Sequence, residues 1–216
     1  MGRFEAADLI LLICIPYYDI PGNPTGKHSI GGEGQMVIRQ ARIGEDEDVL
    51  AFYHDLIDRM QGQPYCPYWK KGVYPTLDVI HSAISRSQMS LATEENRIAG
   101  AFILNRVQGE GYDRVPWRGE VAADEVGVLH LLAVHPDFQG RGLGRTLLES
   151  AVAQSWSKGH RVIRLDTLTW NLPGRRLYEG FGFQWRGDFE LTYPTTGTIP
   201  FSMYELEIGD GDGSLC

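Results

Sequence analysis

The feature that most constrains the fold is an apolar segment that runs straight into a glycine-rich turn and an amphipathic helix. Residues 127–134 (GVLHLLAV) are apolar at nearly every position, as expected of a central strand buried on both faces. The turn follows in residues 139–144 (QGRGLG), a helix is predicted over 143–157, and a further strand over 162–166. The second half of the chain is therefore predicted to contain a βαβ unit.

The glycine-rich turn has the properties of a phosphate-binding site. A turn that opens a helix presents free backbone N–H groups at the end where the helix dipole favours negative charge. Gly140, Gly142 and Gly144 let a ligand approach the backbone closely, and Arg141 and Arg145 add positive charge. The turn lacks both the GK[ST] ending of a P-loop and the GxGxxG spacing of a dinucleotide site. A tight turn that only packs the helix closely is the alternative interpretation.

The other elements follow from hydrophobic periodicity and turn signals. Strands are predicted over residues 36–39, 89–93, 98–104, 183–191 and 201–207 with a hairpin turn at Asn96, helices over 45–60, 77–86 and from about Asn171, and loops over 63–75 and 106–124. Prolines and glycines make residues 1–35 an expected loosely ordered extension, and residues 209–216 an expected flexible tail. One catalytic domain is therefore expected over residues 36–208.

Composition narrows the class of partner. With 28 acidic and 20 basic residues the formal charge is -8, which disfavours nucleic acid and gives a weak attraction for cationic substrates. The cysteines, Cys14, Cys66 and Cys216, form no CxxC pair, so neither a disulfide framework nor a zinc site is expected. The apolar stretch of residues 9–15 is shorter than the roughly 18 to 20 residues that span a bilayer. We therefore expect a cytoplasmic protein that contacts no membrane.

Two motifs in the right order give a family resemblance. Residues 132–144 contain LAVHP followed by QGRGLG, which resembles the coenzyme A loop of the GNAT superfamily of N-acetyltransferases. Residues 171–183 (NLPGRRLYEGFGF) are similar to the segment N-x-x-A-x-x-L-Y-x-x-x-G-F that follows the next strand in those enzymes, with Gly174 in place of the usual alanine. The resemblance covers residues 36 to about 207. It implies an α/β (α+β) GNAT fold, a mostly antiparallel mixed sheet of six to seven strands with helices on both faces.

The resemblance also implies acetyl-CoA as cosubstrate, with no metal. The backbone of the strand end would pair with the pantetheine arm, the glycine-rich turn would hold the pyrophosphate, and an asparagine would contact the arm. The residues at the matching positions are Leu132, Ala133 and Val134 for the strand, Gln139, Gly140, Arg141, Gly142, Leu143, Gly144 and Arg145 for the turn, and Asn171.

Candidate catalytic groups come from the same resemblance. Tyr178 matches the tyrosine that protonates the departing thiolate as a general acid in the family. An amine must also lose a proton before it attacks the thioester, and His130 matches the histidine of arylalkylamine N-acetyltransferases, which the sequence LHLLAVH resembles. A buried, hydrogen-bonded His130 without a catalytic role is the alternative. In that case Glu125 or Asp124 would hold a catalytic water.

The sequence does not determine the identity of the acceptor. Loop 63–75 is rich in proline and aromatic residues, and its rings at Tyr65, Tyr68, Trp69 and Tyr74 suit an apolar or cationic ligand, although packing over the core is an equal alternative. We expect a primary amine of a small molecule or peptide as the substrate and a homodimer by default. A non-catalytic acyl-CoA sensor or scaffold is the other class of function considered.

Overall fold

Seven strands form one mixed sheet in the computed structural model, which describes residues 36–193 and 197–209. In chain order the elements are β1 (Val37–Gln40), α1 (Asp46–Met60), α2 (Leu77–Ser85), β2 (Met89–Glu94), β3 (Arg97–Asn105), the 3₁₀ turns η1 (Tyr112–Arg114) and η2 (Ala123–Glu125), β4 (Val126–Val134), the 3₁₀ turn η3 (Pro136–Phe138), α3 (Leu143–Ser157), β5 (Val162–Leu168), α4 (Leu172–Phe181), β6 (Gln184–Tyr193) and β7 (Gly197–Glu207). The expected extension over 1–35 and all but the first residue of the expected tail lie outside the described residues.

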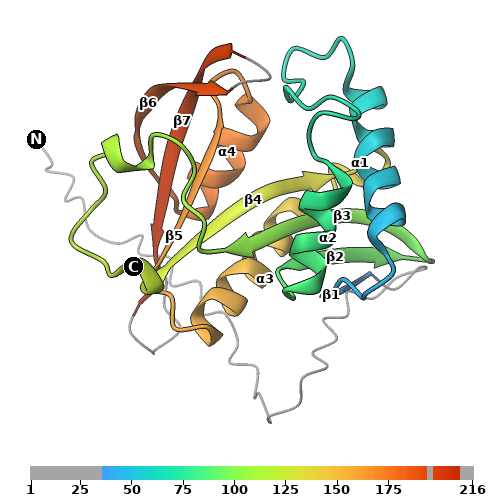
Figure 1. The fold of residues 1–216 in the computed structure, drawn as a ribbon, viewed down its shortest axis with the longest axis horizontal. Helices are drawn as coiled ribbons and strands as arrows, with labels where there is room; N and C mark the ends of the chain where they lie inside the picture. The colour runs from blue at the N-terminus through green and yellow to red at the C-terminus, as the bar shows by residue number, and fades with distance from the viewer. Residues whose placement is uncertain (1–35, 194–196, 210–216) are drawn as a thin grey trace, which may run out of the picture.

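The strand order β1-β2-β3-β4-β5-β7-β6 confirms the predicted sheet. Every neighbouring pair is antiparallel except β4 and β5, the two strands of the βαβ unit (Figure 1). Strand β7 lies between β5 and β6, although it follows both of them in the chain. The predicted hairpin turn at Asn96 is also confirmed, because Glu95 and Asn96 have φ values of 48° and 66° between β2 and β3.

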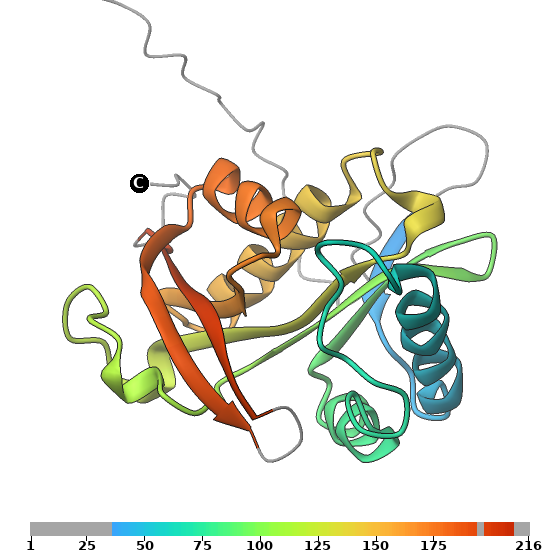
Figure 2. The same cartoon turned by 90° about the horizontal axis from the view of Figure 1, so that it is seen from above.

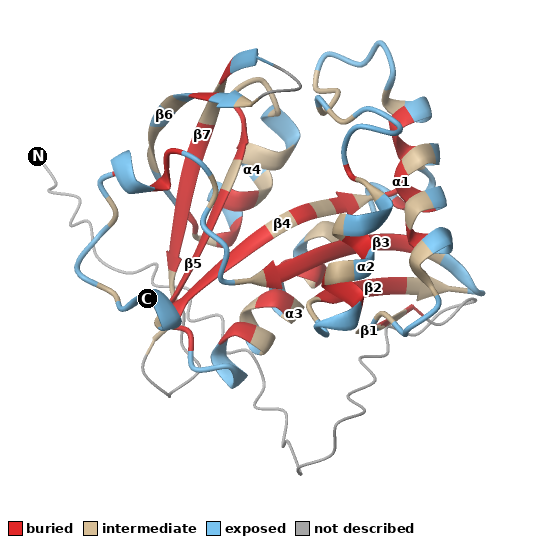
Figure 3. Cartoon of the chain, in the orientation of Figure 1, coloured by how far each residue is buried: buried red, intermediate tan, exposed pale blue. Residues whose placement is uncertain are grey.

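Helices cover both faces of the sheet, as predicted (Figure 2). Helices α1 and α2 pack on one face in a core with β2 to β4, and α3 and α4 pack on the other with residues of β1 to β5 and of β7. Figure 3 shows these inward surfaces as buried and the opposite helix faces as exposed. In α1 the buried positions include Val49, Tyr53 and Leu56, a spacing that places them on one side of a helix. Three acidic residues in its first turn favour its N-terminus.

The parallel pair β4 and β5 separates along its length. The two strands pair only from Val126 to Val128 against Val162 to Arg164. Beyond that point β4 carries a bulge at Leu131, whose φ of 51° is rare for a bulky residue, and its register with β3 shifts. The Leu131 carbonyl oxygen leaves the usual ladder and accepts a hydrogen bond from the buried Tyr53 hydroxyl of α1, 2.7 Å away. The separation leaves room between the two halves of the sheet.

Within the described residues, no helix combines the length and the apolar character needed to cross a bilayer.

Strand β5 runs two residues beyond its predicted end at Asp166, because β7 continues to pair with Thr167 and Leu168. The β6–β7 hairpin is longer than predicted for the same reason, since the pairing extends to Tyr193 and Gly197. These longer strands reach the region where β4 and β5 separate.

Candidate active site

A cavity of about 1090 Å³ lies where β4 and β5 separate. Its walls come from the end of α1, the loop before α2, the second half of β4, the glycine-rich turn, the end of β5, the start of α4 and the β6–β7 hairpin. It brings together most of the residues singled out in the sequence. These are Tyr65, Tyr68, Trp69, Tyr74, His130, Leu132, Ala133, Val134, Gln139, Gly140, Gly142, Leu143, Gly144, Arg145, Asn171 and Tyr178.

The glycines of the turn serve two different purposes. Gly140 and Gly142 have φ values of 75° and 77°, which glycine adopts without strain, and Gly142 caps the start of α3. Gly144 instead allows close packing, because a Cβ there would lie 3.0 Å from a methyl group of Leu177 on α4. The Gln139 side chain donates to the Val134 carbonyl at 3.2 Å and ties the turn to the end of β4. The turn thus presents the start of α3 to the cavity, an arrangement that suits a phosphate group.

The two arginines of the turn have different surroundings. Arg145 lines the cavity, forms an ion pair with Glu149 at 3.2 Å, and lies over the ring of Phe181. Arg141 is not among the residues that line the cavity, because its guanidinium makes two hydrogen bonds of 3.0 and 2.6 Å to Glu94 on β2. The structure therefore directs Arg141 toward the β2–β3 hairpin.

Asn171 links β5 to α4. Its side-chain oxygen accepts from the backbone N–H of Gly174 at 3.2 Å and so caps α4, and its amide nitrogen donates to the Thr167 hydroxyl at 2.9 Å. A Cβ at position 174 would lie 2.5 Å from that amide nitrogen. Glycine in place of the alanine usual in the resembled motif therefore permits this orientation of Asn171.

Tyr178 is buried on α4, with its ring 5.9 Å from the ring of Phe183 and 5.8 Å from that of Tyr204. It lines the cavity. Burial, followed by the charge of Asp166, raises the pKa of the Tyr178 hydroxyl well above its usual range. The hydroxyl therefore carries its proton throughout the physiological pH range and can act as a donor.

His130 and Asp166 lie on the two strands that separate. Nε2 of half-buried His130 is 3.1 Å from Oδ1 of Asn105. Burial lowers the pKa of the imidazole, and Asp166 opposes that change, so His130 is neutral at pH 7 and can accept a proton. Burial raises the pKa of the Asp166 carboxyl, while the Tyr112 hydroxyl, which donates to Oδ1 at 2.8 Å, and His130 oppose the rise.

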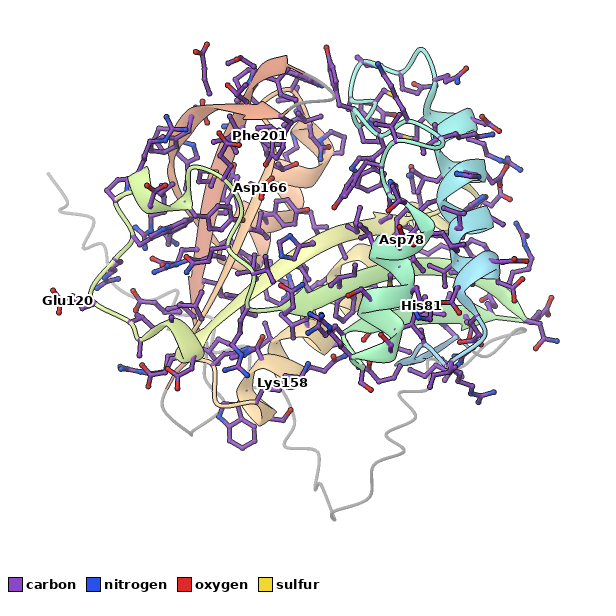
Figure 4. The ribbon with its side chains drawn as sticks, in the orientation of Figure 1. Asp78, His81, Glu120, Lys158, Asp166 and Phe201 are labelled. Carbon is purple, nitrogen blue, oxygen red and sulfur yellow. The ribbon has the colours of Figure 1, made fainter. Side chains whose placement is uncertain are left out.

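Asp166 is the residue that sequence reasoning missed. The signal available was a single acidic side chain within the otherwise apolar end of a strand, residues 162–168 (VIRLDTL). Its surroundings depend on the pairing of β5 with β4 and with β7 and on Tyr112 of η1. Figure 4 labels it on β5, beside Phe201 of β7, which also lines the cavity.

Glu125 does not reach the cavity. It ends η2 at the start of β4, whereas the glycine-rich turn follows the other end of that strand. Its carboxylate accepts from the Ala122 backbone N–H at 3.3 Å and lies 3.8 Å from Arg161. Asp124, in the same 3₁₀ turn, is exposed and likewise does not line the cavity. His130 is thus the candidate base that the structure brings to the cavity.

The aromatic loop both lines the cavity and packs on the core. Trp69 contacts Tyr53 with ring centroids 5.6 Å apart, and the more exposed Tyr68 meets Trp170 of the β5–α4 turn at 5.5 Å. Tyr193 at the end of β6 also lines the cavity, whereas Arg114 and Trp117 in the segment before β4 do not. In the described ranges, 36–193 and 197–209, no three His, Cys, Asp or Glu side chains form a group suited to a metal ion.

Comparison with known proteins agrees with the family resemblance of the two sequence motifs. The family model described as the acetyltransferase (GNAT) family matches residues 52–183. The [ribosomal protein bS18]-alanine N-acetyltransferase of Escherichia coli K12 is 36% identical over 77 residues, which are 36% of this chain and 51% of that protein. An N-acetyltransferase of Methanocaldococcus jannaschii is 31% identical over 68 residues, 32% of this chain and 30% of that protein. The chain thus spans about half or less of the length of these curated relatives.

Solved structures agree in fold. A GNAT family acetyltransferase from Listeria monocytogenes has a TM-score of 0.63 at 21% identity, covering 84% of this chain and 99% of that one. The yncA protein of Salmonella typhimurium, whose structure holds its cofactor acetyl-CoA, has a TM-score of 0.61 at 17% identity, covering 83% and 97%. With the family model matching well over half of its length, the chain belongs to the acetyltransferase (GNAT) family.

Proposed function

We propose that the protein transfers an acetyl group from acetyl-CoA to a primary amine by direct attack within a ternary complex. The observation that carries this proposal is one cavity lined by the glycine-rich turn, Tyr178 and His130. The turn supplies phosphate-binding geometry, the tyrosine a proton donor and the histidine a proton acceptor.

The residues of the cavity fit acetyl-CoA. The separated edge of β4, from Leu132 to Val134, offers backbone groups to an extended arm with amide bonds, and the start of α3 with Arg145 offers a site for phosphate. When bound, acetyl-CoA supplies a thioester carbonyl as electrophile and a thiolate as leaving group. Asn171, fixed by Thr167 and Gly174, borders the same path.

The proposed proton transfers balance. His130 takes one proton from the bound ammonium, which leaves a lone pair on nitrogen for attack on the thioester carbonyl carbon. A carbon–nitrogen bond forms, the carbon–sulfur bond breaks, and the nitrogen loses a second proton to solvent, as His130 later does with the first. Tyr178 donates a proton to the departing thiolate and is reprotonated from solvent. The net products are an amide, free coenzyme A and one proton.

The direct route is favoured over a covalent acyl-enzyme. The described cysteine, Cys66, lies in the aromatic loop but does not line the cavity. Its thiol donates to the Pro67 carbonyl at 3.4 Å, and burial raises its pKa, so the reactive thiolate is disfavoured. Replacing Cys66 with serine should therefore leave turnover intact.

The test is thiol release from acetyl-CoA in the presence of a panel of primary amines. Tyr178→Phe keeps the ring and removes the hydroxyl, so kcat should fall by roughly 10²- to 10⁴-fold while acetyl-CoA binding persists. His130→Gln should lower kcat/KM over a similar range. The matched control is His81→Gln, because His81 is exposed on α2, outside the cavity. Acetyl-CoA binding without thiol release for any amine would indicate a sensor instead.

A further inference from the structure

The charged side chains of the cavity are unevenly distributed. Of the described residues that line it, one is an arginine, one is an aspartate, and none is a lysine or a glutamate. Arg145 belongs to the glycine-rich turn, which the proposed function assigns to phosphate. Asp166 lies on β5 opposite His130, at the acceptor side of the cavity. A substrate on that side therefore meets a carboxyl group and no cationic side chain among the described lining residues.

Asp166 is held in place and partly buried at the wall of the cavity. Tyr112, itself buried, donates its hydroxyl proton to Oδ1 at 2.8 Å. The carboxyl lies close enough to Tyr74, Tyr178 and Tyr193 to contribute, after burial, to the raised pKa of each hydroxyl. A negative charge in such a partly buried site lacks part of the solvation that bulk water would give it. A bound cation with N–H donors would restore that stabilisation.

Aromatic rings form the walls around this carboxyl. Tyr68, Trp69 and Tyr74 reach the cavity from the loop before α2, and Tyr193 and Phe201 reach it from the β6–β7 hairpin. The faces of such rings attract cations and bind apolar groups, so they suit an ammonium on a short hydrocarbon body.

The cavity limits the size of its occupant. The ring contact between Tyr68 and Trp170 joins the loop to the β5–α4 turn across the space between the two halves of the sheet. The total volume of about 1090 Å³ must also hold the acetyl group and part of the pantetheine arm. The acceptor therefore has only part of this volume, and the whole cavity is close to the upper end of the range of about 300 to 1,000 Å³ that small-molecule sites occupy.

We propose that the acceptor is a compact primary ammonium compound without a carboxylate, held with its nitrogen at Asp166 and its body among the rings of Tyr68, Trp69, Tyr74 and Tyr193. This inference rests on the proposed function and specifies its substrate. Asp166 binds and orients the ammonium, and His130, across from it on β4, takes the proton. An amino acid bound in the same way would bring its own carboxylate toward Asp166 with no described cation to receive it.

The experiment compares amines with their carboxylated counterparts: phenethylamine with phenylalanine, histamine with histidine, and cadaverine with lysine, together with a short peptide bearing a free N-terminal alanine. Thiol release should give a kcat/KM at least tenfold higher for one or more amines than for the matched amino acid and for the peptide. Asp166→Asn should raise the KM for that amine at least tenfold and leave acetyl-CoA affinity unchanged. Glu190→Gln, which removes an exposed carboxylate on β6 outside the cavity, is the control.

Calorimetric titration of the amines into coenzyme A-bound protein provides a readout independent of turnover. Binding to the natural chain and its loss in Asp166→Asn support the inference. Equal or better use of amino acids or of the peptide, Asp166→Asn with normal amine KM, or absence of binding by every amine would overturn it. Efficient turnover of amino acids or of the peptide would overturn the inference about the substrate but leave the proposed acetyl transfer intact. Failure to bind acetyl-CoA would instead overturn the proposed function.

Discussion

His130 and Asp166 form a pair whose ionisation is set by burial. Burial disfavours the charged form of each, so the imidazole pKa is lowered and the carboxyl pKa is raised, while the attraction between the two charged forms opposes both shifts. The two groups therefore titrate as a unit rather than as independent sites. The surrounding polar groups are the hydroxyls of Tyr74, Tyr112, Tyr178 and Tyr193, together with Asn105.

The ionisation of His130 and Asp166 predicts how kcat/KM changes at acid pH. His130 accepts a proton only when neutral, and its pKa lies below 6.5, so kcat/KM should fall as the pH drops through a value under 6.5. Asp166→Asn removes the attraction that raises the imidazole pKa and should move this limb to still lower pH. His130→Gln should abolish it. Initial rates from pH 5 to 9 with saturating acetyl-CoA test this, and a limb that persists in His130→Gln would assign the base elsewhere.

The missed role of Asp166 shows where residue-level reasoning stops. Its chemical type was visible in the sequence, but its position opposite His130 depends on the pairing of β4 with β5 and on the contact with Tyr112 from η1. Arg141 shows the converse, because its motif position predicted a ligand contact while Glu94, far earlier in the chain, holds its guanidinium. In both cases the residue that fixes the position of the side chain belongs to an element far away in the sequence.

At the scale of elements, the glycine-rich turn gives a prediction with an internal control. Gly142 and Gly159 bracket α3, have φ values of 77° and 76°, and face open space. Alanine at either position should cost about 1 to 2 kcal/mol of stability through backbone strain. Only Gly142→Ala should weaken acetyl-CoA binding, because only Gly142 lines the cavity. Denaturant unfolding and equilibrium binding measure the two effects, and equal affinities in both variants would contradict the assignment of the turn.

The bulge in β4 gives a second prediction. Tyr53→Phe leaves the buried Leu131 carbonyl without its hydroxyl partner and should cost about 1 to 3 kcal/mol of unfolding free energy. Because the bulge lies within the cavity-lining part of β4, kcat/KM should also fall by about tenfold, equivalent to ~1.4 kcal/mol. Ile57→Val, a buried change on the same helix outside the cavity, should cost about 0.5 to 1.5 kcal/mol without loss of turnover. A folded Tyr53→Phe variant with normal turnover would refute this role of the bulge.

Element boundaries were predictable where local signals were strong. Helix α3 spans its predicted residues, because the glycine-rich turn marks its start and Gly159 follows its end. The predicted end of β5 was wrong by two residues. The strand continues because Thr167 and Leu168 pair with residues of β7 more than 30 positions later in the chain, and local periodicity does not reveal this pairing. The bulge at Leu131 left no mark in an unbroken apolar segment.

At the scale of the whole molecule, the cavity lies between two halves of one sheet that share only a short parallel seam. A ligand that contacts both halves should stabilise the fold by linkage. At 100 times its Kd, acetyl-CoA should add about 2.7 kcal/mol to the free energy of unfolding. Thermal unfolding with and without acetyl-CoA tests this, and hydrogen exchange should show new protection in both β4 and β5. Protection confined to one strand would contradict binding in the separation.

The overall architecture was the most predictable level. Two short motifs implied the family, and the family implied a mostly antiparallel mixed sheet of six to seven strands with helices on both faces, all of which the structure has. The position of Glu125 was not predictable in this way. It is adjacent in sequence to the strand that carries His130, yet a nine-residue strand separates it from the glycine-rich turn.

Strand β7 enters the sheet between two strands that are synthesised before it, and it contributes Ile199 and Phe201 to the wall of the cavity. A nascent chain that has emerged only as far as β6 therefore has the glycine-rich turn and both proposed proton-transfer residues but a cavity that is open on one side. Acetyl transfer should begin only after residues 197–207 have left the ribosome and displaced any direct contact between β5 and β6. Acetyl transfer should thus depend on the strand that enters the sheet last.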